Sequence, residues 1–318
     1  MAILPLLASC TSGSSDPNTS TSAGDYPNDC RSIEIIVGFS AGGATDLAFR
    51  VLADELKERL GKDVQVINAP GGGGVTSINR MLAAKADGCT LGHSSIPSHL
   101  SYLFPESEAN YAPEDFSFAG AFGLGPQVLV VAADSPVQSV DELLASAQNG
   151  RLIAVADSPK GGDAIINAQF ASVTGVGIQQ VVVDGSAEKV TAVLSRQVDF
   201  SNGALGGIIA SVQSGQLRAL AVWSEERVPE LPDVPTAQEL GYDVVASTIQ
   251  ALSMSKDVPE PVRQKLEDTL RDICADSGFA AQLLNVGYQS SFLSGSEYRS
   301  TWADMAVTVQ NIDFDSLN

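Results

Sequence analysis

Residues 33–46 read IEIIVGFSAGGATD, and this stretch decides the fold. It begins with a short apolar run, 33–37, typical of a buried strand, and continues into a glycine-rich turn at 38–43. Apolar residues then recur at helical spacing from Leu47 to Leu60, and Gly61 follows in the position of a helix C-cap. The stretch therefore predicts a strand, a tight turn and an amphipathic helix.

The same pattern follows directly along the chain. A second apolar strand is predicted at 64–67, a second glycine-rich turn at 68–74, a helix through 78–82 and a third strand at 90–93. Strands that alternate with helices and are apolar on both faces are typical of a parallel sheet covered by helices. We therefore expect an α/β protein that begins with a βαβαβ unit.

The rest of the chain continues this alternation, with a proline-rich connector at 230–236. Further strands are predicted at 128–132, 152–156, 179–183, 198–200 and 217–223, and 244–254 is predicted to be extended. Helices are predicted at 140–147, 261–275, 279–285 and 297–310. We expect the last helix to pack back onto the first part of the chain.

Length and charge restrict the possible functions. The chain has 318 residues, enough for two domains, and its net charge is -20. So acidic a chain repels nucleic acids and anionic lipids, and we expect no nucleic-acid partner. Aromatic residues make up only 6%, which argues against an aromatic-lined carbohydrate cleft.

The N-terminus has the pattern of a processed lipoprotein. An apolar run, Ile3 to Leu7, is followed by Ala8-Ser9-Cys10, which matches a bacterial lipobox with Cys10 as the lipidated residue. Residues 11–29 are polar and predict a flexible tether. The alternative is a chance apolar N-terminus, because no Lys or Arg precedes the short run.

Three further cysteines remain: Cys30, Cys89 and Cys274. An exported protein can form disulfides, and Cys30 and Cys89 precede two strands that lie side by side in a doubly wound sheet. We expect a Cys30–Cys89 disulfide; the alternative is three buried thiols. Cys274 falls on a helical pattern and is expected in the core.

The first glycine-rich turn allows two kinds of chemistry. Outward-pointing backbone N–H groups at a helix N-terminus form an anion site that needs no cationic side chain. The ordinary alternative is a strand–helix turn capped by Thr45 or Asp46. The turn also contains Gly38-x-Ser40-x-Gly42, the pattern of a hydrolase nucleophile elbow. A hydrolase needs a histidine base, and only His93 and His99 are present, so a secreted serine hydrolase using Ser40 is the alternative function.

No pattern indicates a cofactor or a metal. The histidines have no second ligand at metal spacing, the turn at 71–74 lacks the Lys-Ser/Thr of a P-loop, and no G-x-G-x-x-G follows a strand. We therefore predict neither a metal nor a bound cofactor.

The glycine-rich turns belong to an ordered series of motifs that covers nearly all of the folded part. They are FSAGG at 39–43 with TD at 45–46, NAPGGGG at 68–74, DG at 87–88 with TL at 90–91, GGD at 161–163, QVD at 197–199, GQLRALAV at 215–222, LPDVPT at 231–236 and ELG at 239–241. In this order they resemble the substrate-binding proteins of tripartite tricarboxylate transporters, the TctC or Bug-type extracytoplasmic solute receptors.

The resemblance implies a two-lobed periplasmic-binding-protein clamp of type II-like fold, each lobe a mostly parallel sheet flanked by helices. It places the first lobe at 30–125, the second at 126–224, and the return to the first lobe with the C-terminal helices at 225–318. It implies no enzymatic activity but capture of a small organic carboxylate, with di- or tricarboxylates such as citrate favoured, and delivery to membrane transporter subunits. We expect an extracytoplasmic monomer that touches the membrane only through its lipid anchor.

The resemblance also implies where the ligand sits. One carboxylate meets the first turn, and the far end meets the turn at 158–163. Ser94 and Ser95, at the end of the third strand, are expected to face the same cleft, because ligands of such sheets bind at the carboxyl ends of the strands. The predicted ligand-binding residues are Phe39, Ser40, Ala41, Gly42, Gly43, Thr45, Asp46, Ser94, Ser95, Ser158, Lys160, Gly161, Gly162, Asp163, Asn202 and Gln250.

Two residues, Lys160 and Ala164, depart from the family pattern, and the charge of a third, Asp163, matters for the ligand. Lys160 stands in a turn of mostly small residues and either pairs with a second carboxylate or is a solvated surface lysine. Ala164 replaces a histidine of many relatives. Asp163 would repel an anion, and it either caps its helix or meets an amino group.

Overall fold

The predicted βαβαβ unit is present in the computed structural model, which describes residues 26–104, 107, 109–183, 186–312 and 314–317. Its elements are β1 (Ile33–Val37), α1 (Ala44–Leu60), β2 (Val64–Asn68), α2 (Val75–Leu82) and β3 (Thr90–Ile96), with a short 3-10 turn η1 (Gly72–Gly74) before α2. Strand β1 pairs in parallel with both β2 and β3. The carboxyl ends of these strands, where the glycine-rich turns begin, therefore lie at one edge of the sheet.

Three more strands complete the sheet of the first lobe. The order is β10-β4-β9-β3-β1-β2, and β9 (Ser247–Ser255), β4 (Phe116–Ala132) and β10 (Gln289–Ser294) all pair antiparallel. The sheet is thus mixed rather than mostly parallel, because β9 and β10 return to it from distant parts of the chain. Strand β10 was not predicted.

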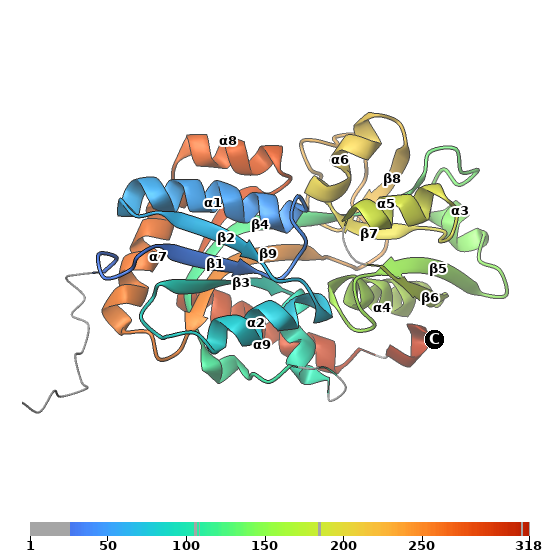
Figure 1. Cartoon of the computed structure of the whole chain (residues 1–318). Helices are drawn as coiled ribbons and strands as arrows, with labels where there is room; N and C mark the ends of the chain where they lie inside the picture. The colour runs from blue at the N-terminus through green and yellow to red at the C-terminus, as the bar shows by residue number, and fades with distance from the viewer. Residues whose placement is uncertain (1–25, 105–106, 108, 184–185, 313, 318) are drawn as a thin grey trace, which may run out of the picture.

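Helices cover both faces of this sheet (Figure 1). Helix α1 packs with α7 (Glu260–Cys274) and α8 (Ser277–Asn285) in one buried cluster that includes Phe49, Leu266 and Phe279. Helix α2 packs with α9 (Gly295–Gln310) in another, which includes Ile78 and Trp302. Helix α9 therefore returns to the first lobe, as expected. Two 3-10 turns, η2 (Ser98–Leu103) and η3 (Pro113–Asp115), precede β4.

Strand β4 joins the two lobes. Its first part pairs with β9 and β10, and its last part, from Gln127 onward, pairs antiparallel with β7 (Ser201–Ala204) and β8 (Leu217–Val222). The strand predicted at 128–132 is only the end of this longer element. One continuous strand that belongs to both lobes places their facing edges close together.

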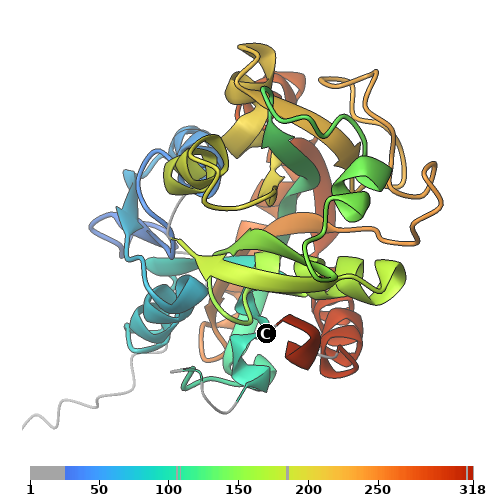
Figure 2. The same cartoon turned by 90° about the vertical axis from the view of Figure 1, so that its right-hand side faces the viewer.

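The second lobe completes the clamp (Figures 1 and 2). Its remaining elements are α3 (Val140–Ala145), β5 (Arg151–Ala156), α4 (Gly162–Thr174), β6 (Gly177–Val182), α5 (Ser186–Leu194) and α6 (Leu205–Gln213). Strands β5 and β6 pair in parallel, and a core around Phe170 and Trp223 lies beneath them. The expected fold, a two-lobed α/β clamp with helix-flanked sheets, is confirmed.

Two sequence expectations for this lobe are wrong. A strand was predicted at 198–200, but β7 begins at Ser201, and Phe200 forms only an isolated bridge with Ala154. The apolar residues of that run point into the core, while the polar residues that follow pair with β4. In addition, the segment 225–246 was assigned to the first lobe, yet its buried residues pack in the second lobe; they are Val228, Leu231, Ala237, Val244 and Ala246. The terminal turn η4 (Phe314–Leu317) also packs there, through Leu317.

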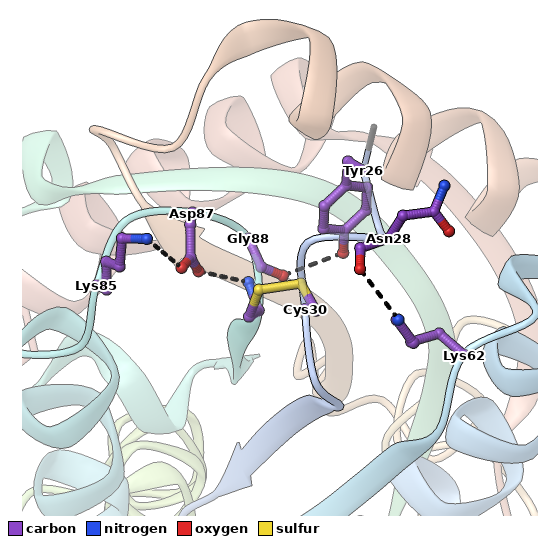
Figure 3. The surroundings of a disulfide bond; sticks show 8 residues. Tyr26, Asn28, Cys30, Lys62, Lys85, Asp87 and Gly88 are labelled. Atoms are coloured by element: carbon purple, nitrogen blue, oxygen red, sulfur yellow. Dashed lines mark hydrogen bonds and ion pairs between the residues drawn. A yellow bond between two sulfur atoms is a disulfide. The ribbon is translucent and has the colours of Figure 1, made fainter. Parts of the chain in front are cut away.

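A disulfide fixes the start of the fold (Figure 3). Cys30 and Cys89 are bonded, with Cα atoms 5.4 Å apart, at the neighbouring starts of β1 and β3. Residues 26–29, predicted as the end of the tether, instead form a turn in which the Tyr26 side chain is buried and its hydroxyl donates to the Gly88 carbonyl at 3.0 Å. Cys10 and the rest of the predicted tether lie outside the described residues. Cys274 carries a free thiol that is partly buried.

Within the described ranges, no helix combines the length and the apolar character needed to cross a bilayer. The same ranges contain no group of three or more His, Cys, Asp or Glu side chains arranged to hold a metal.

A candidate ligand cleft between the lobes

A cavity of about 500 Å³ is lined by residues of both lobes. The first lobe contributes residues 38–45 and 71–73 from the two glycine-rich turns, together with Ser95 and Tyr288. The second lobe contributes Asp157, Gly162, Asp163 and residues 187–190, while β4 adds Gln127 and β9 adds Thr248. A smaller cavity of about 340 Å³ lies on the second lobe beside α4 and 243–245.

The first wall of the cleft is the N-terminal end of α1. The helix begins after Gly43, which has no side chain to cap the first turn, and residues 38–45 all line the cavity. Gly42 has a φ of 83°, a left-handed conformation that a residue with a Cβ rarely adopts, and the space next to it is open. The positive end of a helix thus faces the cavity, and among the described residues no charged side chain of this turn lines it.

Asp46 holds this turn from behind rather than lining the cavity. Its side chain is 1% exposed and accepts hydrogen bonds from Gly42 N at 2.8 Å, Arg50 Nε at 2.9 Å and Asn68 Nδ2 at 2.8 Å. Burial alone would raise the pKa of this carboxyl, but these hydrogen bonds outweigh it and hold the pKa below its usual value. Asp46 is therefore a positioning residue for the turn.

Two buried histidines support the same wall. His93 Nδ1 accepts the Gly38 N–H at 3.2 Å, His99 Nδ1 accepts the Ser95 N–H at 3.2 Å, and the two ring centroids are 4.3 Å apart. Burial lowers the pKa of His99 to about 3, and burial together with His99 lowers the pKa of His93 well below its ordinary range. Both rings are therefore neutral at neutral pH.

This arrangement does not match the serine hydrolase alternative. A nucleophilic Ser40 needs a histidine within hydrogen-bond reach. Both histidines instead accept backbone N–H groups, and in the described part of the chain neither is bonded to Ser40.

Three polar side chains, bonded to one another, close the cleft beside α1. Gln250 Nε2 donates to Tyr288 Oη at 3.0 Å and to Thr45 Oγ1 at 3.4 Å, and Thr45 and Tyr288 line the cavity. Gln250 was predicted to bind ligand but lies behind these two hydroxyls. Tyr288 was missed because it directly precedes β10, a strand whose polar sequence gives little signal.

The second wall carries most of the charge. Asp157 Oδ1 accepts the backbone N–H groups of Ser158 at 3.0 Å and Asp163 at 3.3 Å, at the N-terminal end of α4. The Asp163 carboxylate forms an ion pair with Lys189 of α5, and both side chains are largely buried. Burial raises the pKa of Asp163 to about 6, while Lys189 acts in the opposite direction. The sequence pointed to Asp163 but missed Lys189.

Several predicted residues do not line the cavity. Ser94 Oγ is bonded to Tyr298 Oη at 2.9 Å, and Asn202 lies inside the second lobe between Asn167 and Trp223. Lys160 Nζ lies 4.8 Å from the centroid of the Phe104 ring.

Two more predicted residues have other places in the turn before α4. A Cβ on Gly161 would lie 2.3 Å from Asp157 Oδ1, so this glycine allows the turn to close on that carboxylate. Ser158 instead approaches the other lobe, because a Cβ on Gly73 would lie 3.4 Å from Ser158 Oγ. Nine predicted residues do line the cleft: Phe39, Ser40, Ala41, Gly42, Gly43, Thr45, Ser95, Gly162 and Asp163.

Comparisons with known proteins agree with this architecture. A family model described as a tripartite tricarboxylate transporter family receptor matches residues 48–310. The chain belongs to this receptor family. Protein BugT of Bordetella pertussis is 33% identical over 271 residues, which cover 82% of each chain.

Solved structures share the receptor fold. An R. palustris protein solved with adipate has a TM-score of 0.83 at 22% identity, with 90% of the receptor and 96% of that chain covered. MatC from Rhodopseudomonas palustris, solved with bound malate, has a TM-score of 0.81 at 21% identity and covers 88% of the receptor and 98% of its own chain. At these identities the likeness concerns the fold.

Proposed function

We propose that the protein is an extracytoplasmic receptor that captures a small organic carboxylate between its lobes and delivers it to the membrane subunits of a tripartite tricarboxylate-type transporter. The observation that carries the proposal is the uncapped N-terminal end of α1, which faces a cavity of about 500 Å³. A carboxylate there accepts backbone hydrogen bonds and gains up to about 2 kcal/mol from the helix end.

In this proposal binding and lobe closure are coupled. Contacts with the second wall form only when the lobes are together, so the ligand stabilises the closed form by its extra affinity for it. The transporter then recognises the closed, loaded receptor. No covalent step is involved, and we propose no enzymatic activity.

The ligand class is supported by the two structural neighbours, which were solved with malate and with adipate. The resemblance favoured a di- or tricarboxylate such as citrate, and Lys160, as a possible partner of a second carboxylate, would have suited such a ligand. Because Lys160 lies against an aromatic ring outside the cavity, that preference loses its support from this residue. We retain the broader class, small organic carboxylates.

We also propose anchoring through a lipid on Cys10 and action as a monomer. The lipobox pattern before a polar stretch supports the anchor, and the cleft is formed within one chain. Mass spectrometry of the protein from a bacterial membrane fraction tests the anchor. An unmodified Cys10 would refute it.

A thermal-shift screen tests the receptor function, because a ligand that binds only the folded state raises the melting temperature by mass action. The panel contains mono-, di- and tricarboxylates, including citrate, and amino and aromatic acids. A saturable rise with at least one carboxylate is expected. If none of them raises the melting temperature of ligand-free protein, the proposal is wrong.

Gly42→Val locates the binding in the cleft. The valine side chain would enter the cavity beside α1 and block the carboxylate. Gly241→Val is the matched control, because Gly241 has a φ of 90°, equally open space and a place outside the cleft. Both variants bear similar backbone strain, on the order of 1–2 kcal/mol. Only Gly42→Val should lose the rise in melting temperature that the carboxylate causes.

A further inference from the structure

The second wall of the cleft is acidic, and this bears on the ligand's chemistry. Among the described residues that line the cavity, the carboxylates are Asp157, Asp163 and Glu188, and Lys189 is the one cationic side chain. The first wall binds anions through backbone N–H groups. The two ends of the cavity therefore differ in charge.

The positive groups of the second wall are already engaged by the protein's own carboxylates. The N-terminal end of α4 is occupied by Asp157, which accepts the Asp163 N–H at 3.3 Å. Lys189 is paired with Asp163, which is 6% exposed. A second ligand carboxylate at this wall would have to compete with these interactions and would be repelled by the carboxylates there, Glu188 included.

An independent observation indicates that the ligand carries a hydrogen-bond donor. Gln127 is 5% exposed and lines the cavity; its Nε2 donates to Thr248 Oγ1 at 2.5 Å, but its Oε1 has no partner. A buried carbonyl oxygen without a donor is costly, and a ligand N–H group would satisfy it, whereas a carboxylate would not.

We propose that the ligand is an amino carboxylate with no second carboxylate, bound with its carboxylate at the N-terminal end of α1 and its ammonium group at the second wall. The ammonium supplies positive charge to Asp163 and Glu188 and a donor to Gln127 Oε1. This inference rests on the proposed receptor function and narrows its substrate class.

Calorimetric titration of the purified full chain with matched ligand pairs tests the inference. The amino carboxylates are glycine, β-alanine, γ-aminobutyrate and δ-aminovalerate, and each is compared with the dicarboxylate that has the same number of methylene groups: malonate, succinate, glutarate and adipate. At the length that binds best, the amino carboxylate should bind at least about tenfold more tightly, which corresponds to about 1.4 kcal/mol.

Charge-neutral variants of the second wall should reduce this preference. Glu188→Gln removes an exposed carboxylate and should lower the ratio of the two dissociation constants by about threefold. Asp163→Asn should lower it by about tenfold or more, since this carboxylate is buried. Glu225→Gln is the control: it changes the net charge equally at an exposed site outside the cavity and should leave the ratio unchanged.

The outcomes separate the two proposals. Tighter binding of a dicarboxylate at every length, or an unchanged ratio in Glu188→Gln, would overturn the amino-carboxylate inference and leave the receptor function standing. Glu188→Gln gives this answer even if Asp163→Asn fails to fold. Absence of binding by both kinds of ligand and by all other carboxylates would overturn both proposals.

Discussion

Replacing His99 with asparagine should reduce the acid sensitivity of the fold. His99 is fully buried against His93, and its Nδ1 accepts the Ser95 N–H, which an asparagine carbonyl oxygen can also do. Burial lowers the pKa of His99 to about 3, from 6.5 for an exposed histidine. The variant therefore removes a buried titrating group while keeping the hydrogen bond.

Whether acidification raises or lowers the free energy of unfolding depends on which state, folded or unfolded, binds the proton first. Because the folded pKa is lowered, the unfolded chain takes up a proton first as the pH falls below 6.5, and the stability present above that pH is lost on the way to about 3. Between about pH 7 and about pH 5, this single group should lower the free energy of unfolding by about 2 kcal/mol.

Urea unfolding of both proteins at the two pH values measures the effect. The carboxylates titrate in both proteins and largely cancel in the difference, and the chain has only 2 histidines. The variant should lose about 2 kcal/mol less than the natural sequence on acidification. An equal loss in both proteins would show that His99 accepts a proton without penalty, and the argument from burial would be refuted.

Three further predictions concern the frame of the clamp. Replacing Cys30 and Cys89 together with serine opens a loop with a sequence separation of 59 and should lower the free energy of unfolding by about 4 kcal/mol in urea titrations; a loss below about 1 kcal/mol would contradict it. Gly206→Ala places a Cβ 1.9 Å from the Val286 carbonyl oxygen, where α6 of the second lobe meets the turn after α8 of the first lobe. Because the lobes can then no longer close fully, the variant should bind the carboxylate at least about tenfold more weakly in calorimetry. Unchanged affinity would rule out closure at this contact. Lys160→Ala should leave the carboxylate dissociation constant within about twofold, since its ammonium lies over Phe104; a large loss would return Lys160 to the ligand site.

The sequence predicted the first lobe's nucleus well because its signals are local. The apolar run at 33–37 forms a largely buried strand, the run at 64–67 pairs beside it at the edge of the sheet, and the helix between them has buried apolar positions and a glycine C-cap. The pairing of Cys30 with Cys89 followed from the parallel order of two strands.

The parts that were missed depend on tertiary contacts. Strands β7 and β10 are short of apolar residues and are defined by their pairing with β4, which local patterns do not reveal. The sequence pointed to Lys160 as a candidate because of its position in a turn, whereas the fold brings Lys189 into the cleft from a separate helix. Which side chain faces a cavity is decided by how helices pack.

We propose above all that the cleft at the N-terminal end of α1 binds a small carboxylate. A crystal structure of the chain with the tightest carboxylate of the thermal-shift screen tests it most directly. We expect the carboxylate group to accept hydrogen bonds from backbone N–H groups of residues 40–45 other than Gly42, which donates to Asp46, with the rest of the ligand enclosed by both lobes. A ligand bound elsewhere, such as in the smaller cavity beside α4, with the cleft filled only by water, would contradict the account.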